Sequence, residues 1–206
     1  MSTASEVARR LLQIKAIKLS PDDPFTWASG IKSPIYCDNR IVLSYPEVRN
    51  FIKAKLVDTA AQFAAYDLVA GVATAGISHG ALLADALGLP FAYVRSKAKG
   101  HGRQNLIEGR IPEGSKILVV EDLISTGGSC LQAVEALRGA GHTVTGVLAI
   151  FTYGFERAER AFADAQVPYR TLSDYAHLID EAARTDYVST DDVAALQAWR
   201  ARTGAA

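Results

Sequence analysis

The stretch Lys116-Ile-Leu-Val-Val-Glu-Asp-Leu-Ile-Ser-Thr-Gly-Gly-Ser129 decides the fold class of this chain. Its four apolar residues predict a buried strand that ends at two adjacent acids, Glu121 and Asp122. A loop rich in Ser, Thr and Gly then leads into a predicted helix. Buried strands joined to helices form parallel sheets, which bind ligands at the carboxyl ends of their strands. The stretch therefore predicts an α/β fold with a ligand site beside the two acids.

The loop itself has the features of an anion site. Gly127 and Gly128 allow a ligand to approach the backbone and permit a positive φ. The helix start offers N–H groups and a favourable dipole, and Thr126 and Ser129 add hydroxyl donors. Adjacent acids would repel a second phosphate but accept hydrogen bonds from sugar hydroxyls, directly or through Mg²⁺. We therefore expect a ribose 5-phosphate, although a strand-to-helix turn with an acidic edge is the plainer alternative.

The remaining sequence alternates between apolar runs and helical patterns, which predicts one domain over residues 1–206 with a parallel sheet flanked by helices. Thr3 and Thr190 are the expected caps of the first and last helices, and Pro46 is expected to start a long helix that reaches Phe63. Residues 20–46 are rich in proline and aromatic residues and are expected to be irregular or to form short strands. The further strands are expected at 67–72, 91–94 and 143–151, and the other helices at 5–17, 78–87, 129–141, 173–184 and 190–202.

Two further segments carry candidate binding residues. Gly71-Val-Ala-Thr-Ala-Gly-Ile-Ser78 follows an expected strand, and its small residues permit close backbone approach, although close packing of helix on strand explains them equally well. Arg95-Ser-Lys-Ala-Lys-Gly-His-Gly102 is a basic stretch without an apolar face and predicts a long loop that acts as a lid. A solvated charged loop is the alternative for this second segment.

These segments, in this order, resemble the type I phosphoribosyltransferases, whose signature is an apolar strand, two acids and a Thr/Gly-rich loop. The basic loop is similar to the Arg…Lys-x-His-Gly pattern of orotate phosphoribosyltransferases, with Ser96 after Arg95 and Lys97 one residue later than the second basic residue of some members. Ser29-Gly-Ile-Lys-Ser-Pro-Ile-Tyr36 resembles the hood of that family, but Ala28 stands where other members have Lys.

The resemblance implies a type I phosphoribosyltransferase fold with a small N-terminal hood that includes residues 20–45. It implies transfer of the 5-phosphoribosyl group from phosphoribosyl diphosphate (PRPP) to orotate in pyrimidine biosynthesis. Lys99 and His101 would be catalytic, and Ser125, Lys32 and Tyr36 would bind orotate. The implied PRPP-binding residues are Ala73, Thr74, Ala75, Gly76, Arg95, Lys99, His101, Glu121, Asp122, Leu123, Ile124, Ser125, Thr126, Gly127, Gly128 and Ser129.

The same resemblance implies Mg²⁺ as cofactor, held mainly by PRPP and water rather than by direct side-chain ligands. It also implies a homodimer in which the lid loop is shared across subunits. A purine phosphoribosyltransferase and a non-catalytic PRPP-sensing regulator are the alternatives. The regulator is disfavoured because the lid residues are present and the net charge is zero.

Composition limits the remaining classes. Lys plus Arg is 22 and Asp plus Glu is 22, so there is no overall basic field, which argues against nucleic acid as a partner. No apolar run approaches the roughly 20 residues of a membrane span, and the N-terminus lacks a signal-peptide pattern. Two cysteines are too few for a disulfide framework. We therefore expect a cytoplasmic protein.

Overall fold

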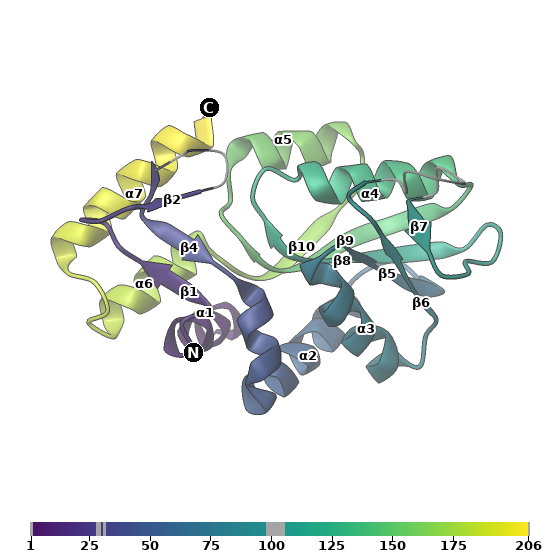
Figure 1. The fold of residues 1–206 in the computed structure, drawn as a ribbon, viewed down its shortest axis with the longest axis horizontal. Coiled ribbons are helices and arrows are strands. Elements are labelled where there is room, and N and C mark those ends of the chain that lie inside the picture. Colours follow the sequence, from purple (N-terminus) through teal and green to yellow (C-terminus); the bar gives the residue numbers. More distant parts are fainter. Residues whose placement is uncertain (1, 28–29, 31, 98–105, 206) are drawn as a thin grey trace.

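The computed structural model describes residues 2–27, 30, 32–97 and 106–205, and its centre is a six-stranded sheet (Figure 1). The strand order is β10-β9-β8-β5-β6-β7, and every neighbouring pair is parallel except β6 with the antiparallel β7. The predicted parallel sheet is thus confirmed. Its strands are β5 (Leu68–Val72), β6 (Phe91–Val94), β7 (Ile107–Glu108), β8 (Lys116–Ile124), β9 (Thr143–Thr152) and β10 (Tyr169–Asp174).

Helices cover both faces of this sheet. On one face lie α2 (Pro46–Ala60) and α3 (Ala75–Leu87), and on the other lie α4 (Gly128–Gly139) and α5 (Glu156–Asp164) (Figure 1). Alternate residues of β8 therefore enter different cores: Leu118 and Val120 pack with the α2 and α3 side, whereas Ile117 and Val119 pack with α4 and α5. Burial on both faces explains why the strand is apolar without alternation.

The order in which the strands are added places the ligand site. From β5 the chain adds β6 on one side and then crosses to add β8 on the other side. The connections after β5 and β8 consequently leave the sheet next to each other, at the point where the winding direction changes. Open α/β sheets bind ligands in the crevice at such a switch point.

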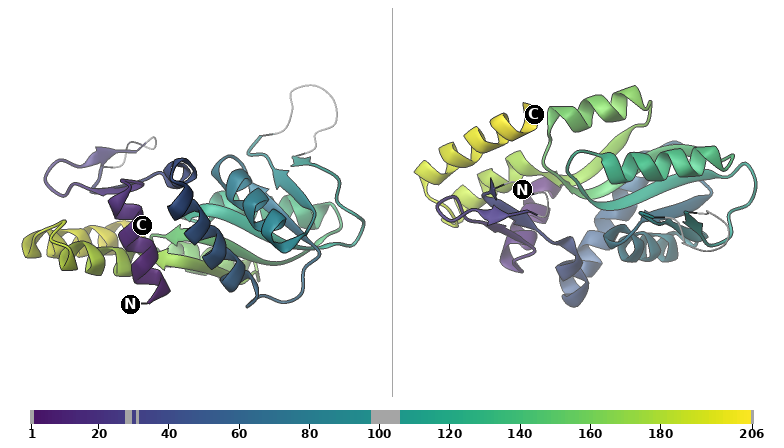
Figure 2. Two further views of the ribbon diagram at one scale, coloured as in Figure 1. Left: turned by 90° about the horizontal axis from the view of Figure 1, so that it is seen from below. Right: turned by 45° about the horizontal axis from the view of Figure 1, so that its top comes forward.

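The hood lies at one end of the sheet (Figures 1 and 2). Strand β1 (Ile17–Leu19) pairs antiparallel with β4 (Ile35–Cys37), β2 (Phe25–Thr26) pairs with β3 (Lys32–Ser33), and the 3₁₀ helix η1 (Asn39–Ser44) leads into α2. Strand β1 precedes residues 20–45, the segment that was predicted to form part of the hood. Around it lie α1 (Thr3–Gln13), α6 (Tyr175–Arg184) and α7 (Thr190–Ala205).

The C-terminal helix α7 fastens the hood. The Trp199 indole N–H donates to the Lys32 carbonyl over 3.2 Å, and the Trp199 ring meets Trp27 edge to face at 5.9 Å between centroids. Trp27 in turn stacks on Tyr153, which follows β9, at 5.4 Å. The hood is therefore joined through aromatic contacts to both the sheet and the C-terminal helix.

Several boundaries differ from the predictions. Ser2 caps α1 in place of Thr3, because its hydroxyl accepts the Ser5 N–H over 3.1 Å. Ser189 precedes α7 and exchanges hydrogen bonds with Asp192, so Thr190 is the first helical residue and not the cap. Helix α2 begins at Pro46 as predicted but ends at Ala60, before Phe63.

Strand β8 extends to Ile124, so the two acids belong to the strand and not to the loop after it. Strand β10 occupies 169–174, and the helix predicted from residue 173 starts at Tyr175. Strand β7 and helix α5 were not predicted. None of the described helices has the length and apolar character needed to cross a membrane.

Candidate active site

Two adjoining clefts open at the switch point, and they differ in chemistry. The first, called the charged cleft here, has a volume of about 370 Å³ and is bordered by acids, one arginine and small residues. The second, the base slot, measures about 240 Å³ and is almost entirely apolar. Cys37 and Leu123 line both clefts, which therefore form one continuous site. The charged cleft is lined by Cys37, Asp38, Arg40, Ala73, Thr74, Ala75, Glu121, Asp122, Leu123 and Ser129.

The two predicted acids have different surroundings in the charged cleft. Glu121 is buried, and its carboxylate accepts the Asp122 N–H and the Ser129 hydroxyl, each over 3.0 Å. Burial, followed by the neighbouring Asp122 charge, raises the pKa of Glu121 well above its usual range. Asp122 is only half-buried. Asp122 is thus the acid more accessible to a ligand.

Behind Asp122 lies a buried polar pair that the sequence did not single out as functional. The fully buried Asn39 donates its side-chain N–H to the Asp122 carbonyl over 2.8 Å, which ties η1 of the hood to β8. His79 on α3 is also buried, and burial lowers its pKa, so the imidazole is neutral near pH 7. Among the residues that the structure describes, the Asn39 Oδ1 and the His79 Nε2 have no hydrogen-bond partner.

The loop after β8 has the predicted form of an anion site. Gly127 has φ +83° and is followed by the first turn of α4. Gly128 is already helical and does not use a positive φ. Within the described part of the chain, the backbone N–H groups of Thr126, Gly127 and Gly128 make no protein hydrogen bond. Three donors at a helix start are thus available to one anion.

Not every residue predicted to bind PRPP faces this site. Ile124 is buried in the core between the sheet and α4, and its carbonyl accepts the Tyr153 N–H and the Thr152 hydroxyl. Its predicted PRPP contact therefore has no support in the structure. The Ser129 hydroxyl lines the charged cleft, but its proton is donated to Glu121.

The loop after β5 faces the charged cleft with small residues. Ala73, Thr74 and Ala75 line the cleft, the Ala73–Thr74 peptide bond is cis, and the Ala73 N–H donates to the Val94 carbonyl over 2.8 Å. Gly76 is buried against β8, where a Cβ atom would lie 2.4 Å from the Val120 carbonyl oxygen. Close packing of helix on strand, one of the two interpretations of this loop, is therefore present in addition to the open cleft.

The described part of the basic loop flanks the same place. Arg95 and Ser96 border a small depression that also includes Ala73 and Ser129, so Arg95 lies beside both connecting loops. The Arg95 guanidinium donates to the Glu108 carboxylate over 3.3 Å. Lys97 is exposed. The predicted Lys99 and His101 lie outside the described residues.

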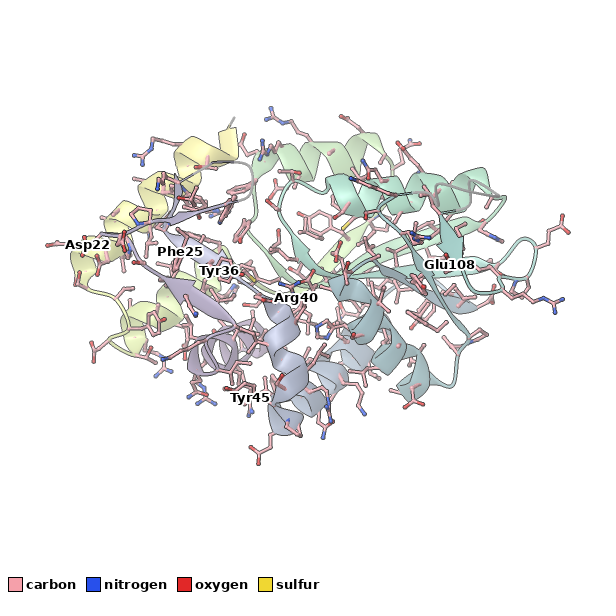
Figure 3. The ribbon with its side chains drawn as sticks, viewed as in Figure 1. Asp22, Phe25, Tyr36, Arg40, Tyr45 and Glu108 are labelled. Atoms are coloured by element: carbon pink, nitrogen blue, oxygen red, sulfur yellow. The ribbon has the colours of Figure 1, made fainter. Side chains whose placement is uncertain are left out.

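The base slot is formed by the hood and by the ends of β8 and β9. Its lining residues are Trp27, Tyr36, Cys37, Leu123, Ser125 and Tyr153. Ser125 and Tyr36, which were both predicted to bind orotate, line this slot. Figure 3 shows Tyr36 beside Phe25, and their ring centroids are 5.7 Å apart. Burial raises the pKa of both Cys37 and Tyr153, so each keeps its proton.

Lys32 does not line the base slot. Its ammonium group donates to the Thr26 hydroxyl over 2.7 Å, and its side chain borders a separate hollow beside Trp199 of α7. The predicted contact of Lys32 with orotate therefore has no support here. Sequence reasoning named neither Trp27 nor Tyr153 as binding residues, because only the tertiary stacking of hood on sheet brings them together.

A third cavity, of about 390 Å³, lies between α5, α6 and α7 and is separate from this chemistry. Its Arg200 donates to the carbonyls of Tyr153 and Gly154, over 3.0 and 2.9 Å. These bonds hold α7 against the segment after β9. The role of Arg200 is therefore structural.

Among the described residues, no group of three His, Cys, Asp or Glu side chains is arranged to hold a metal ion. The charged cleft nevertheless presents carboxylates from Asp38, Glu121 and Asp122. Carboxylate oxygens are ligands that Mg²⁺ prefers, usually one or two together with substrate phosphates. The cleft therefore suits a magnesium ion that arrives with a phosphorylated substrate.

A parallel sheet with an anion loop and two acids at its switch point defines the phosphoribosyltransferase class, and the phosphoribosyl transferase domain model matches residues 47–184. An orotate phosphoribosyltransferase of Bacteroides fragilis is 57% identical over 194 residues, covering 94% of this chain and 92% of that protein. The chain belongs to the orotate phosphoribosyltransferase family.

Solved structures agree with this assignment. The orotate phosphoribosyltransferase of Aeropyrum pernix superposes with a TM-score of 0.77 at 29% identity, covering 89% of this chain and 99% of that one. The Mycobacterium tuberculosis enzyme in complex with PRPP gives a TM-score of 0.67 at 25% identity, covering 85% and 98%.

Proposed function

We propose that this protein is an enzyme that transfers the 5-phosphoribosyl group from PRPP to orotate, giving orotidine 5′-phosphate and pyrophosphate in pyrimidine biosynthesis. The observation that carries the proposal is the junction of the two clefts. A charged cleft with an anion loop and an apolar slot for a flat ring meet at Leu123 and Cys37. Membership of the orotate family favours orotate over a purine base.

PRPP occupies the charged cleft in this proposal. The N–H groups of Thr126, Gly127 and Gly128 bind the 5-phosphate at the start of α4. Asp122 accepts hydrogen bonds from the ribose hydroxyls, while Asn39 fixes its backbone. The diphosphate lies against residues 73–76, with Arg95 in the adjoining depression that shares Ala73. The 5-phosphate and the diphosphate thus bind at neighbouring loops.

Orotate enters the base slot from the hood side. Trp27, Tyr36 and Tyr153 supply aromatic surface for the pyrimidine ring, and the Ser125 hydroxyl supplies a polar contact. The apolar walls of the slot favour stacking of the pyrimidine ring, and they offer few hydrogen-bond partners to its polar substituents. The few polar groups therefore determine how the ring is oriented.

The reaction forms a bond between a base nitrogen and the anomeric carbon and breaks the bond from that carbon to the diphosphate oxygen. Positive charge develops on the ribose, and the Asp122 carboxylate lies on the cleft wall where it stabilises that charge. Lys99 and His101, carried by the loop that resembles the family's lid, stabilise the leaving diphosphate. No enzyme nucleophile is needed because the base is the nucleophile.

Mg²⁺ neutralises phosphate charge when it is bound, and we propose that PRPP and water provide most of its ligands. Asp38 and Asp122 outnumber the one arginine among the described residues that line the charged cleft, so a polyanion would meet net repulsion there without added cations. Asp122 is the side chain placed best to contact such an ion or its water. The acidic character of the cleft is what supports this cofactor.

The test of the proposed function is turnover with defined substrates. Purified protein, PRPP and Mg²⁺ should consume orotate and release an equal amount of pyrophosphate. Adenine, guanine and hypoxanthine serve as matched alternative acceptors. Turnover of a purine without turnover of orotate would overturn the substrate assignment.

We also propose a homodimer in which the lid serves the neighbouring subunit, and a cytoplasmic location. The dimer rests on the resemblance of the basic loop to the family's loop. Both cysteines are free thiols, which suits a reducing compartment. Mixing a Lys99→Ala variant with an Asp122→Asn variant should restore activity, since one active site of each mixed dimer would be intact. Absence of restoration despite demonstrated subunit exchange would contradict the shared site.

A further inference from the structure

Arg40 brings a positive charge from the hood to the charged cleft. It lies on η1, three residues after the end of β4, and Figure 3 shows it between the hood and the end of the sheet. Its side chain lines the charged cleft together with residues 73–75 and does not line the base slot. The structure therefore places Arg40 beside the charged cleft and away from the base slot.

Asp38 holds the Arg40 guanidinium in a two-point contact. Arg40 Nε donates to Asp38 Oδ1 over 2.7 Å and Nη2 donates to Oδ2 over 2.9 Å, while the Asp38 carboxylate also accepts the Arg40 backbone N–H. Hydrogen bonding from Arg40 lowers the pKa of Asp38, so the pair stays charged. A guanidinium has five N–H donors, and this contact uses two of them. Three donors therefore remain for a ligand, on a side chain that is 58% exposed.

The loop after β5 contains no positive charge, although the proposed function places the diphosphate against it. Residues 73–76 are Ala-Thr-Ala-Gly, and the nearby His79 is buried with a lowered pKa. Arg40 is the one cation among the described residues that line the charged cleft. Across Ala73, Arg95 borders the adjoining depression. The two arginines therefore border adjoining depressions that share Ala73.

We propose that Arg40 binds the diphosphate of PRPP and of the pyrophosphate product, together with Arg95 of the adjoining depression and with Asp38 as its positioning residue. Arginine suits this role because its planar fork matches phosphate oxygens. The inference rests on the proposed function, which assigns the diphosphate to residues 73–76. It makes the hood a contributor to leaving-group binding as well as to base recognition.

Binding measurements separate this role from the alternatives. Calorimetry with PRPP and Mg²⁺, and separately with inorganic pyrophosphate and Mg²⁺, should show about tenfold weaker binding to Arg40→Ala than to the unaltered protein. Arg40→Lys should give an intermediate loss because it keeps the charge and loses the fork. The KM for orotate should change by less than about twofold, because the base slot does not include Arg40.

Arg184→Ala is the matched control. Arg184 is a similarly exposed arginine, 55% exposed and paired with the Glu181 carboxylate, but on helix α6 outside both clefts. It should bind PRPP and pyrophosphate normally. Thermal melts of all three variants separate lost binding from lost folding.

Three outcomes would overturn the inference. The first is unchanged binding of PRPP and pyrophosphate to a folded Arg40→Ala protein. The second is an equal loss of binding in Arg184→Ala. The third is a rise in the KM for orotate alone, which would show that Arg40 contacts the base instead of the diphosphate. Failure of the proposed function is a different result. If the protein binds PRPP through Arg40 but never consumes orotate, the role of Arg40 stands and the assignment of orotate as the substrate fails.

Discussion

The connections β5–α3 and β8–α4 lie next to each other at the switch point, and glycines lie at or beside both of them. At the first connection, glycine is needed because there is no space for a side chain. A Cβ at Gly76 would lie 2.4 Å from the Val120 carbonyl oxygen, and one at Gly71 would lie 2.6 Å from the Gly76 carbonyl oxygen. In the second, glycine supplies a conformation, because Gly127 has φ +83°. One pattern, a glycine-rich loop after a buried strand, thus has two physical origins.

The two connections also differ in how they obtain charge. Strand β8 and its loop carry their own acids, hydroxyls and unpaired N–H groups. The loop after β5 contains no charged side chain between residues 73 and 76, and cations flank it from Arg40 and Arg95. The β8 loop is therefore complete in itself, whereas the β5 loop depends on tertiary neighbours.

Gly76→Ala should have the largest effect. The added methyl meets backbone that cannot rotate away, so the unfolding free energy should fall by about 3 kcal/mol, measured by denaturant titration. Gly139→Ala is the control, since a Cβ at that helical position meets no atom within 4 Å. Equal stabilities of the Gly76 and Gly139 variants would show that α3 is not tightly packed on β8.

Gly127→Ala should come second. A left-handed conformation costs a non-glycine residue about 1–2 kcal/mol, and the Phe162 ring, 2.9 Å from the added Cβ, must also shift. Gly127→Asn should lose less, because asparagine tolerates positive φ. Chemical denaturation of both variants measures the difference, and a loss larger for Asn than for Ala would contradict a conformational cause.

Glu121→Gln should have a smaller effect that depends on pH. The folded protein raises the pKa of Glu121, so its contribution is favourable below the unfolded pKa of about 4.3 and is lost as pH rises toward the folded pKa. The variant should therefore melt above the unaltered protein near pH 8, and the gap should close near pH 4. If the variant instead melts below the unaltered protein near pH 8, Glu121 is ionised there and its neighbours stabilise the carboxylate by hydrogen bonds. Turnover should fall with the loss of the carboxylate.

Gly128→Ala should have the smallest effect on folding. Gly128 is helical and a Cβ would contact only the Thr126 hydroxyl oxygen at 3.8 Å, so stability should rise by about 0.5 kcal/mol. PRPP binding is the informative measurement. Weaker PRPP binding without lost stability would place the 5-phosphate against this residue, and unchanged binding would remove Gly128 from the predicted set.

The central elements could be predicted from the sequence because their cause is local. The apolar runs of β5, β6, β8 and β9 are buried on both faces, so each is recognisable without its neighbours. Strand β10 and helix α5 were missed for the opposite reason. The β10 sequence Tyr-Arg-Thr-Leu-Ser-Asp is half polar because it lies at the sheet edge, and α5 is short, with few buried residues.

The candidate site was predictable only where one segment contains the whole feature. The loop from Ser125 to Ser129 is such a segment, and its Gly127 conformation is confirmed. Asn39, Trp27 and Tyr153 join the site through contacts between distant segments, and no local spacing indicates them. Lys32 shows the reverse case, since its charge suggested a base contact and the fold directs its amine to Thr26.

The edge-to-face contact between Trp27 and Trp199, which holds α7 against the hood, also provides a built-in fluorescence probe. The chain contains two tryptophans, Trp27 and Trp199, and both belong to this contact. Trp27 lines the base slot, and Trp199 reports on the C-terminal helix. Tryptophan fluorescence, excited selectively over that of the tyrosines, therefore comes from one corner of the molecule, and a titration with orotate can be followed there without any attached dye.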